Sequence, residues 1–355
     1  MKFIHTADLH LGARSSSKLP PAKAEQRRLE QEETFAAIAD LAEREGAAVL
    51  IAGDVFDTAT PPRRTVTAFL DTVRLHAGTR FFCLPGNHDG GSFPTDDLPE
   101  NLTVFGADWE CTSLGDTDIY GIAPSGDIPY DGLCPDPARH NIVLLHGAVR
   151  AGGTPEPGAV VLSRLAGRGI DYLALGHYHS VQTGALDGRG VWAYSGTPEG
   201  RGMDEADGGY VLTIDTAEAP VAPRKHRVAR RLIHRLPVDI TGTEGRTPEI
   251  LERVTRAVAD LSREDIVRIE LTGKLPPETP APDTDRLGAH LAPSFFFAEV
   301  KDKTGLLLDT AALHESRTLK GEFMRKVMAA ELSEEERAAI LRMGLAALRG
   351  EGDEI

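Results

Sequence analysis

The sequence is poor in cysteine and in long apolar runs. Its 355 residues include three cysteines, Cys83, Cys111 and Cys134, which form neither a disulfide framework nor a C-x-x-C pair. The longest clean apolar runs, such as Ala47–Ala52, are far shorter than the roughly 20 residues that a membrane-spanning helix needs. The N-terminus has only Lys2 as a positive region, so it does not read as a signal peptide. These absences predict a cytoplasmic protein with free thiols and no membrane segment.

Positive charge is scarce in the first part of the chain. The formal net charge is −15 at pH 7, of which residues 1–220 carry −14 and residues 221–355 carry −1. By itself this balance argues against a polyanionic partner such as nucleic acid. The exception is a run of six basic residues without an acidic one between residues 224 and 235. Two interpretations stay open for it: phosphate contacts, or a solvated strand edge protected by charge. The candidate contacts in this run are Arg224, Lys225, Arg227, Arg230 and Arg231.

The first 220 residues alternate β-rich runs with amphipathic stretches, which predicts a layered α/β domain. One helix is expected between the first two strands, and another is expected to begin after Pro61-Pro62. The expected strands are Lys2–Thr6, Ala48–Ala52, Arg80–Leu84, Asp118–Ile122, Asn141–Leu145, Asp171–Leu175, Val191–Ser195 and Tyr210–Ile214.

The rest of the chain predicts two smaller parts after a proline-containing linker at Ala217–Pro223. Residues 221–309 should form a smaller α/β unit with a helix capped by Thr247. Residues 310–355 should be helical, with a capping box at Ser333 and Glu336. The strands expected in the α/β unit are Arg231–Leu236, Ile266–Leu271 and Phe295–Val300, and the apolar stripe expected in the helical segment is Leu319, Phe323 and Val327.

Five short motifs rich in Asp, Asn and His each follow an expected strand. Side chains at the carboxyl ends of strands in an α/β sheet converge on the crevice where ligands bind. Two carboxylates, one amide oxygen and five imidazoles favour mixed nitrogen and oxygen coordination of Mn²⁺, Fe²⁺ or Zn²⁺. Two such ions can clamp a phosphoryl group. The motifs are Asp8-Leu9-His10, Gly53-Asp54-Val55-Phe56-Asp57, Gly86-Asn87-His88-Asp89, His146-Gly147 and Gly176-His177-Tyr178-His179.

In this order the five motifs resemble the pattern of the calcineurin-like metallophosphoesterases, D-x-H, G-D-x-x-D, G-N-H-D/E, H and G-H-x-H. Within that superfamily, residues 5–12 and 53–58, followed by Pro61-Pro62, are similar to the SbcD-type DNA repair exonucleases. The resemblance covers residues 1–215 well and the remainder more loosely. It implies a layered β-sandwich flanked by helices, with a smaller α/β capping domain and a C-terminal helical segment.

The resemblance also implies a centre of two divalent ions, Mn²⁺ ahead of Fe²⁺ or Zn²⁺, bridged by Asp54. His88 would stabilise the transition state and protonate the leaving oxygen, with Asp89 orienting it through a hydrogen bond. Asp57 would align a ligand histidine. The implied ligands are Asp8, His10, Asp54 and His179 for one ion, and Asp54, Asn87, His146 and His177 for the other.

The implied function is a DNA exonuclease or endonuclease that works in repair with an SbcC-like coiled-coil ATPase. The basic run would then contact DNA, and the C-terminal helical segment would dock the ATPase. Formation of a homodimer is a further possibility that the resemblance leaves open. Two other functions remain: a cytosolic phosphoesterase acting on a small nucleotide or other phosphorylated metabolite, and a non-catalytic adaptor. The adaptor is the weaker of the two because no implied ligand is missing.

Overall fold

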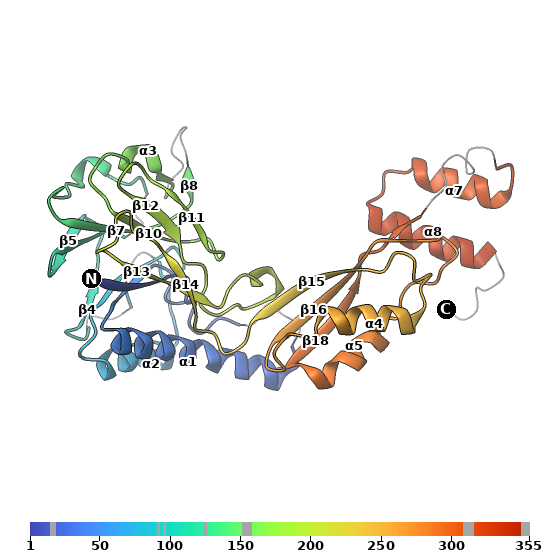
Figure 1. The fold of residues 1–355 in the computed structure, drawn as a ribbon, viewed down its shortest axis with the longest axis horizontal. Coiled ribbons are helices and arrows are strands. Elements are labelled where there is room, and N and C mark those ends of the chain that lie inside the picture. Colours follow the sequence, from blue (N-terminus) through green and yellow to red (C-terminus); the bar gives the residue numbers. More distant parts are fainter. Residues whose placement is uncertain are drawn as a thin grey trace. The chain divides into compact units, whose positions relative to one another are not determined.

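The computed structural model describes residues 1–14, 19–90, 93–94, 97–123, 126–150, 158–307 and 316–348. The chain divides into two compact units, Met1–Leu232 and Ile233–Ile355 (Figure 1). The division falls at Leu232 and not at residue 220, because strand β14 (Arg224–Arg227) pairs with β13 (Tyr210–Asp215) and so belongs to the first unit. The expected boundary between residues 309 and 310 lies outside the described residues.

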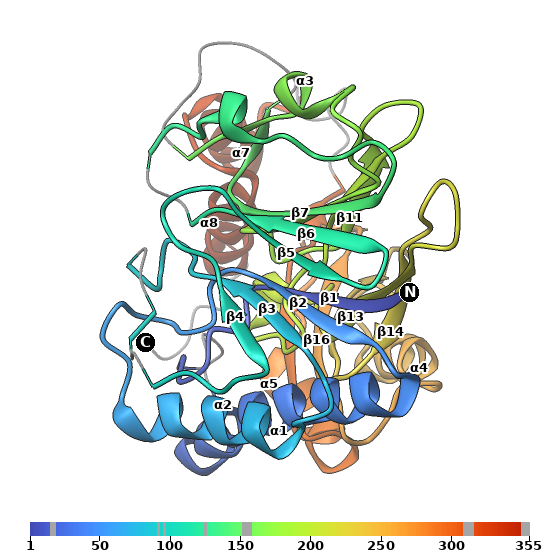
Figure 2. The ribbon, with the colours of Figure 1, turned by 90° about the vertical axis from the view of Figure 1, so that its left-hand side faces the viewer.

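The first unit contains two six-stranded sheets that face each other (Figure 2). Helices α1 (Pro21–Glu45) and α2 (Arg63–Leu75) cover the outer face of the first sheet, and the short α3 (Leu162–Leu165) lies over the second. In spatial order, the first sheet is β14, β13, β1 (Lys2–Thr6), β2 (Ala48–Ala52), β3 (Phe81–Leu84) and β4 (Leu102–Val104). The second is β11 (Gln182–Ala185), β12 (Val191–Tyr194), β10 (Tyr172–Gly176), β7 (His140–His146), β6 (Thr117–Gly121) and β5 (Glu110–Leu114). A small parallel ribbon joins β8 (Val149–Arg150) and β9 (Val160–Val161).

The apolar runs of the central strands are buried on both faces, as their composition predicts for parallel strands covered on two sides. In β2, Ala48 and Leu50 point between the two sheets, whereas Val49 and Ile51 pack under the helices. The inner layer joins residues such as Phe82 of the first sheet to the second. The expected layered α/β sandwich is therefore confirmed, and the strands predicted for this unit lie within one residue of their expected bounds.

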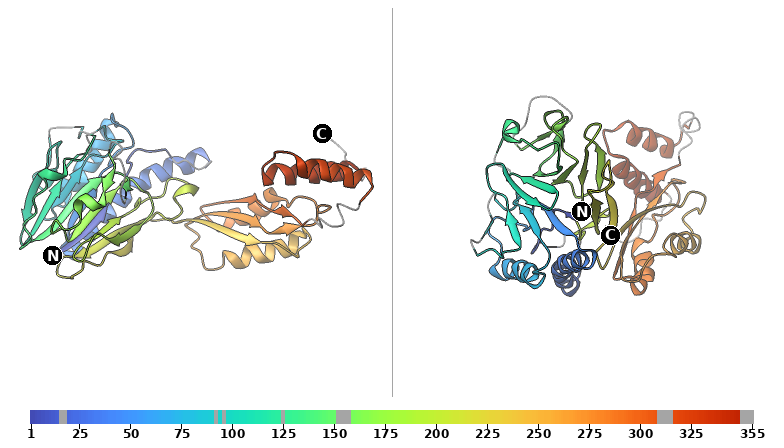
Figure 3. Two further views of the ribbon diagram at one scale, coloured as in Figure 1. Left: turned by 90° about the horizontal axis from the view of Figure 1, so that it is seen from above. Right: turned by 60° about the vertical axis from the view of Figure 1, so that its left-hand side comes forward.

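The second unit is built on a parallel sheet of β15 (Ile233–Asp239), β16 (Ile266–Thr272) and β18 (Phe297–Asp302). Helices α4 (Thr247–Ala257) and α5 (Thr284–Leu291) pack on one face of this sheet and share its apolar core (Figures 1 and 3). A two-stranded ribbon joins β17 (Lys274–Leu275) and β19 (Gly305–Leu306). Thr247 is the first helical residue of α4 and does not cap it; Arg246 holds the cap position without a side-chain hydrogen bond, so that prediction is wrong.

Helices α7 (Leu319–Ala329) and α8 (Glu334–Leu348) form a small helical pair with its own core. The capping box is confirmed, since Ser333 Oγ accepts the Glu336 backbone N–H at 3.2 Å and the Ser333 N–H donates to the Glu336 carboxylate at 2.9 Å. The expected stripe is incomplete, because Val327 is buried but Leu319 is 71% exposed. Among the helices of the described ranges, none combines the length and the apolar character needed to cross a bilayer.

Candidate metal centre

The five motifs meet at one edge of the first unit. Strands β1, β2 and β3 run parallel in the first sheet, and β7 and β10 run parallel in the second, so their carboxyl ends carry all five motifs. At that edge the sheets touch: a Cβ added at Gly176, at the end of β10, would overlap the Ala52 carbonyl oxygen at the end of β2. The convergence predicted from strand ends is thus what the fold produces.

The backbone of these motifs is strained where the ligands are expected. Among the described residues, five non-glycine positions have positive φ, and four are implied metal ligands. Strained backbone of this kind persists only where the surrounding structure enforces it, and it clusters at functional sites. The four positions are Asp8 (52°), His10 (44°), Asp54 (52°) and His177 (111°).

Two glycines of the motifs are required by close approach. A Cβ at Gly53 would overlap the imidazole of His146, and one at Gly86 would overlap the carboxylate and backbone nitrogen of Asp54. Gly53 also has φ of 92°, a conformation that side chains with a Cβ rarely adopt. The glycines therefore let Asp54 and His146 approach one another from different sheets.

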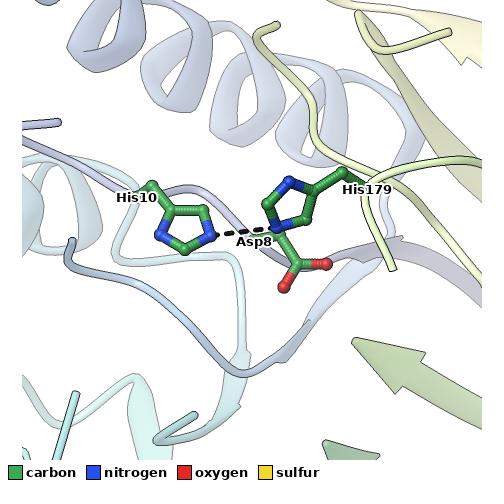
Figure 4. A group of neighbouring side chains, drawn as sticks. All are labelled: Asp8, His10 and His179. Atoms are coloured by element: carbon green, nitrogen blue, oxygen red, sulfur yellow. Dashed lines mark hydrogen bonds between the residues drawn. The ribbon is translucent and has the colours of Figure 1, made fainter. Parts of the chain in front are cut away.

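One half of the centre brings together Asp8, His10 and His179 (Figure 4). The Nε2 atoms of the two imidazoles lie 3.2 Å apart, and each ring turns that nitrogen toward the other. The Asp8 carboxylate accepts the backbone N–H of His177 at 3.0 and 3.1 Å, which fixes it beside the pair. Asp8 and His10 are fully buried.

The other half gathers Asp54, Asn87, His146 and His177. His146 Nε2 lies 2.9 Å from Asn87 Oδ1 and 3.5 Å from Asp54 Oδ2. The ring of His177 lies 5.5 Å, between centroids, from that of His146. Asp54 Oδ2 is also 3.7 Å from His10 Nε2, so this one carboxylate oxygen faces both halves.

These donors fit divalent cations. Two nitrogens that each coordinate one ion at about 2.1 Å can be no more than about 4.2 Å apart, and the 3.2 Å between His10 and His179 meets that limit. The implied ligands are nitrogen and oxygen atoms without a thiolate, a set that suits Mn²⁺, Fe²⁺ or Zn²⁺. Burial lowers the pKa of His146 to about 4 and also lowers that of His10, which keeps both imidazoles neutral and able to bind metal. Burial raises the pKa of Asp8 to about 8, so an ion bound there displaces a proton.

His88 and Asp89 lie in the same loop but do not contact each other as expected. The Asp89 carboxylate accepts the backbone N–H groups of Val55 (3.0 Å), Phe56 (2.8 Å) and Gly86 (2.8 Å). His88 Nδ1 lies instead 3.2 Å from the carbonyl oxygen of Asp57. We therefore correct the expected hydrogen bond from Asp89 to His88: both Asp89 oxygens are occupied by backbone donors, and the residue ties the second and third motifs together.

Two residues of this site were not expected from the sequence, Arg201 and Glu205. Glu205 is buried, and its Oε1 lies 2.8 Å from Nδ1 of His179. Burial alone would raise the pKa of Glu205, but hydrogen bonds from His179 and Arg201 outweigh it and lower that pKa to about 2. Arg201 also reaches Asp57 at 3.1 Å, and Asp57 Oδ1 is 3.5 Å from His10 Nδ1, close to the aligning role expected for Asp57. The one sequence signal was a pair of opposite charges four residues apart in a glycine-rich loop.

The basic run is only partly at the surface. Arg224, Lys225 and Arg227 lie exposed on β14, the edge strand of the first sheet, and Arg230 is exposed just after it. Arg231 is 3% exposed and pairs with Glu30 at 2.8 Å inside the first unit. We therefore correct the expectation that Arg231 contacts DNA, because its guanidinium is held by a buried carboxylate.

Comparisons with known proteins agree with this geometry. A family model for the calcineurin-like phosphoesterases matches residues 1–181. The chain is 27% identical over 217 residues to the DNA double-strand break repair protein Mre11 of Sulfolobus acidocaldarius, covering 56% of this chain and about half, 55%, of that relative. It is 28% identical over 298 residues to Mre11 of Aeropyrum pernix, with 74% and 70% covered. It is 27% identical over 316 residues to the uncharacterized metallophosphoesterase YhaO of Bacillus subtilis, with 78% and 72% covered.

The match to the family model spans more than half of the chain, and it contains all five motifs completely. The structure brings the implied ligands of all five motifs to one edge of the sandwich. The chain therefore belongs to the calcineurin-like phosphoesterase family.

Proposed function

We propose that this phosphoesterase is a DNA nuclease of the SbcD type. Membership of the family implies a hydrolase that acts on phosphoesters through a dinuclear metal centre. The observation that carries the choice of DNA is the exposure of one side of the centre. Asn87, His88 and His177 are exposed, whereas Asp8 and Asp54 are buried. A DNA strand is too large to be enclosed in a closed pocket, so a centre that cleaves DNA must be open to the surface on one side. The exposed side of this centre meets that condition.

In this proposal the chain holds two divalent ions, which would polarise the phosphodiester and supply the attacking nucleophile. Asp8, His10 and His179 hold one ion and Asn87, His146 and His177 the other. Asp54 faces both sets and serves as the shared ligand. His88 stands beside the centre, exposed, and donates a proton to the leaving oxygen.

The proposed DNA contacts are the exposed basic residues Arg224, Lys225, Arg227 and Arg230. The proposed partner, an SbcC-like ATPase, would dock on α7 and α8. This helical pair carries large exposed apolar side chains: Leu319 and Met343 are each 71% exposed and Leu348 is 44% exposed. A cytoplasmic location and a homodimer remain predictions.

One observation favours a small nucleotide or other phosphorylated metabolite as the substrate instead. Arg231 is sequestered by Glu30, and Arg224 pairs with Glu218 at 2.8 Å, so the basic run offers less charge to a polyanion than its sequence implies. Because the metal chemistry is the same for both kinds of substrate, only assays on each substrate can distinguish them.

The deciding experiment gives the purified chain Mn²⁺ and end-labelled single- and double-stranded DNA, with and without the ATPase. A mononucleotide and a chromogenic phosphodiester are assayed in parallel. We expect labelled DNA to be shortened or cut by the wild type and not by Asp54→Asn, whereas Asp108→Asn, an exposed aspartate, behaves as wild type. Hydrolysis confined to the small substrates, with DNA untouched in the presence of the ATPase, would overturn the nuclease proposal.

A further inference from the structure

The guanidinium of Arg201 donates hydrogen bonds to two carboxylates next to the half of the centre formed by Asp8, His10 and His179. Arg201 lies in the loop between β12 and β13 and donates to Glu205 Oε1 from Nη2 at 2.6 Å and from Nε at 3.0 Å. Its Nη1 donates to Asp57 Oδ1 at 3.1 Å. The Arg201 backbone N–H also donates to Glu205 Oε2 at 2.6 Å, which fixes the loop around the carboxylate.

Each of these carboxylates faces a different imidazole. Glu205 Oε1 is 2.8 Å from His179 Nδ1, and Asp57 Oδ1 is 3.5 Å from His10 Nδ1. An imidazole that donates its Nδ1–H to a carboxylate keeps its lone pair on Nε2. At His179 the same Nδ1 also lies 3.2 Å from Arg201 Nη2, which donates to Glu205 at 2.6 Å. Both Nε2 atoms are the ones that face each other across 3.2 Å, at the position proposed for one ion.

The second half of the centre has no comparable charged support among the described residues. His146 Nδ1 lies 2.9 Å from the backbone carbonyl oxygen of Ala52, a neutral acceptor. The ring of His177 has His146 and Tyr178 as its ring neighbours and is exposed. A carboxylate that accepts a hydrogen bond from a ligand histidine raises the basicity of that histidine more than a neutral acceptor does. The histidines His10 and His179 should therefore be the more basic ligands of the two halves.

We propose that Arg201 and Glu205 are positioning residues that orient His179 and, through Asp57, His10, and that they act on one of the two ion sites. The inference rests on the proposed dinuclear centre, but not on DNA as its substrate. The site of Asp8, His10 and His179 is then the tighter of the two. Loss of the Arg201–Glu205 pair weakens that site and leaves the other unchanged.

The test is Mn²⁺ binding to the full chain, followed by calorimetry and by the electron paramagnetic resonance signal of free Mn²⁺. Glu205→Gln keeps the shape of the side chain and removes its charge, and Arg201→Lys keeps a charge but cannot hold two carboxylates as the guanidinium does. The matched control is Glu252→Gln, which breaks an exposed Arg256–Glu252 pair with the same spacing in α4. Urea unfolding of the metal-free variants shows whether each is folded at the assay temperature.

We expect the wild type to bind two ions in two steps, and Glu205→Gln to weaken the tighter step by about 10- to 100-fold while the weaker step is unchanged. Arg201→Lys should weaken the same step by a smaller factor, and Glu252→Gln should change neither. Equal weakening of both steps, or no change in a folded Glu205→Gln, would overturn the positioning role. Two-step binding by a wild type that leaves DNA intact would overturn the nuclease proposal alone.

Discussion

The Nε2 atoms of His10 and His179 lie 3.2 Å apart although the two residues are 169 positions apart in the sequence. Nδ1 of each ring faces a carboxylate, at 2.8 Å for His179 and 3.5 Å for His10, so Nε2 is the nitrogen that each ring turns toward the other. Two lone pairs at that distance repel unless a cation or a proton lies between them. The pair therefore needs a proton or a cation between the rings, and its geometry fits the ion that we propose.

Gly86→Ala should damage the centre although it replaces none of the proposed ligands. Its Cβ would overlap the Asp54 carboxylate, and Gly86 does not adopt positive φ, so the effect is steric alone. We expect weaker Mn²⁺ binding, since Asp54 faces both halves, and a loss of unfolding free energy of about 1–3 kcal/mol from overpacking. Gly188→Ala is the control, because a Cβ there meets nothing within 4 Å. Unchanged Mn²⁺ binding in Gly86→Ala would contradict the proposal that Asp54 is the ligand shared by the two halves.

His88→Ala should separate chemistry from metal binding. The side chain is exposed beside the centre and its Nδ1 lies near the Asp57 carbonyl oxygen. We expect both ions to be retained and turnover to fall by about 100- to 10,000-fold, the usual range for a lost general acid. His140→Ala, at the opposite end of the strand that finishes at His146, should keep its turnover. Metal content by mass spectrometry decides: an ion missing from His88→Ala would refute this role.

Asp89→Asn should act mainly on stability. The carboxylate accepts three backbone N–H groups, and an amide would turn its own NH₂ toward at least one of them. We expect the free energy of unfolding to fall by about 1–3 kcal/mol, measured by urea denaturation, because a buried donor loses its acceptor. Activity should fall with it, since the loop carries Asn87 and His88. A loss of turnover in Asp89→Asn at unchanged stability would contradict this and would support a direct contact between Asp89 and His88.

His5 should make the metal-free protein sensitive to acid. It is fully buried, its Nδ1 lies 2.8 Å from the Tyr172 hydroxyl, and burial lowers its pKa to about 3. The unfolded chain, with a histidine pKa of about 6.5, takes up the proton first as pH falls, so stability decreases with falling pH. Between pH 7 and pH 5 the free energy of unfolding should fall by about 2 kcal/mol more in the wild type than in His5→Asn. If the free energies of unfolding of wild type and His5→Asn, measured in chelator, fell in parallel between pH 7 and pH 5, this prediction would be wrong.

The sandwich and the convergence of the candidate ligands followed from local sequence. The central strands are continuous apolar runs, and a ligand follows each of them within a few residues, so strand ends alone predict the convergence of Asp8, Asp54 and His146. The family resemblance supplied the pairing of ligands to ions, which spacing could not.

The support around the ligands was not predictable in the same way. Glu205 and Arg201 follow no motif, and their contacts to His179 and Asp57 arise from the path of one loop. In the sequence Arg231 cannot be distinguished from its basic neighbours, but in the fold it pairs with Glu30. In each case a long-range ion pair, and not a local pattern, decides what the side chain does.

Anomalous diffraction from crystals grown with Mn²⁺ would show directly whether two ions bind at the motif edge. We expect two peaks per chain, one within coordinating distance of His10 and His179, the other of Asn87 and His146, and both next to Asp54. A single peak at saturating Mn²⁺, or peaks away from Asp54, would contradict the dinuclear centre.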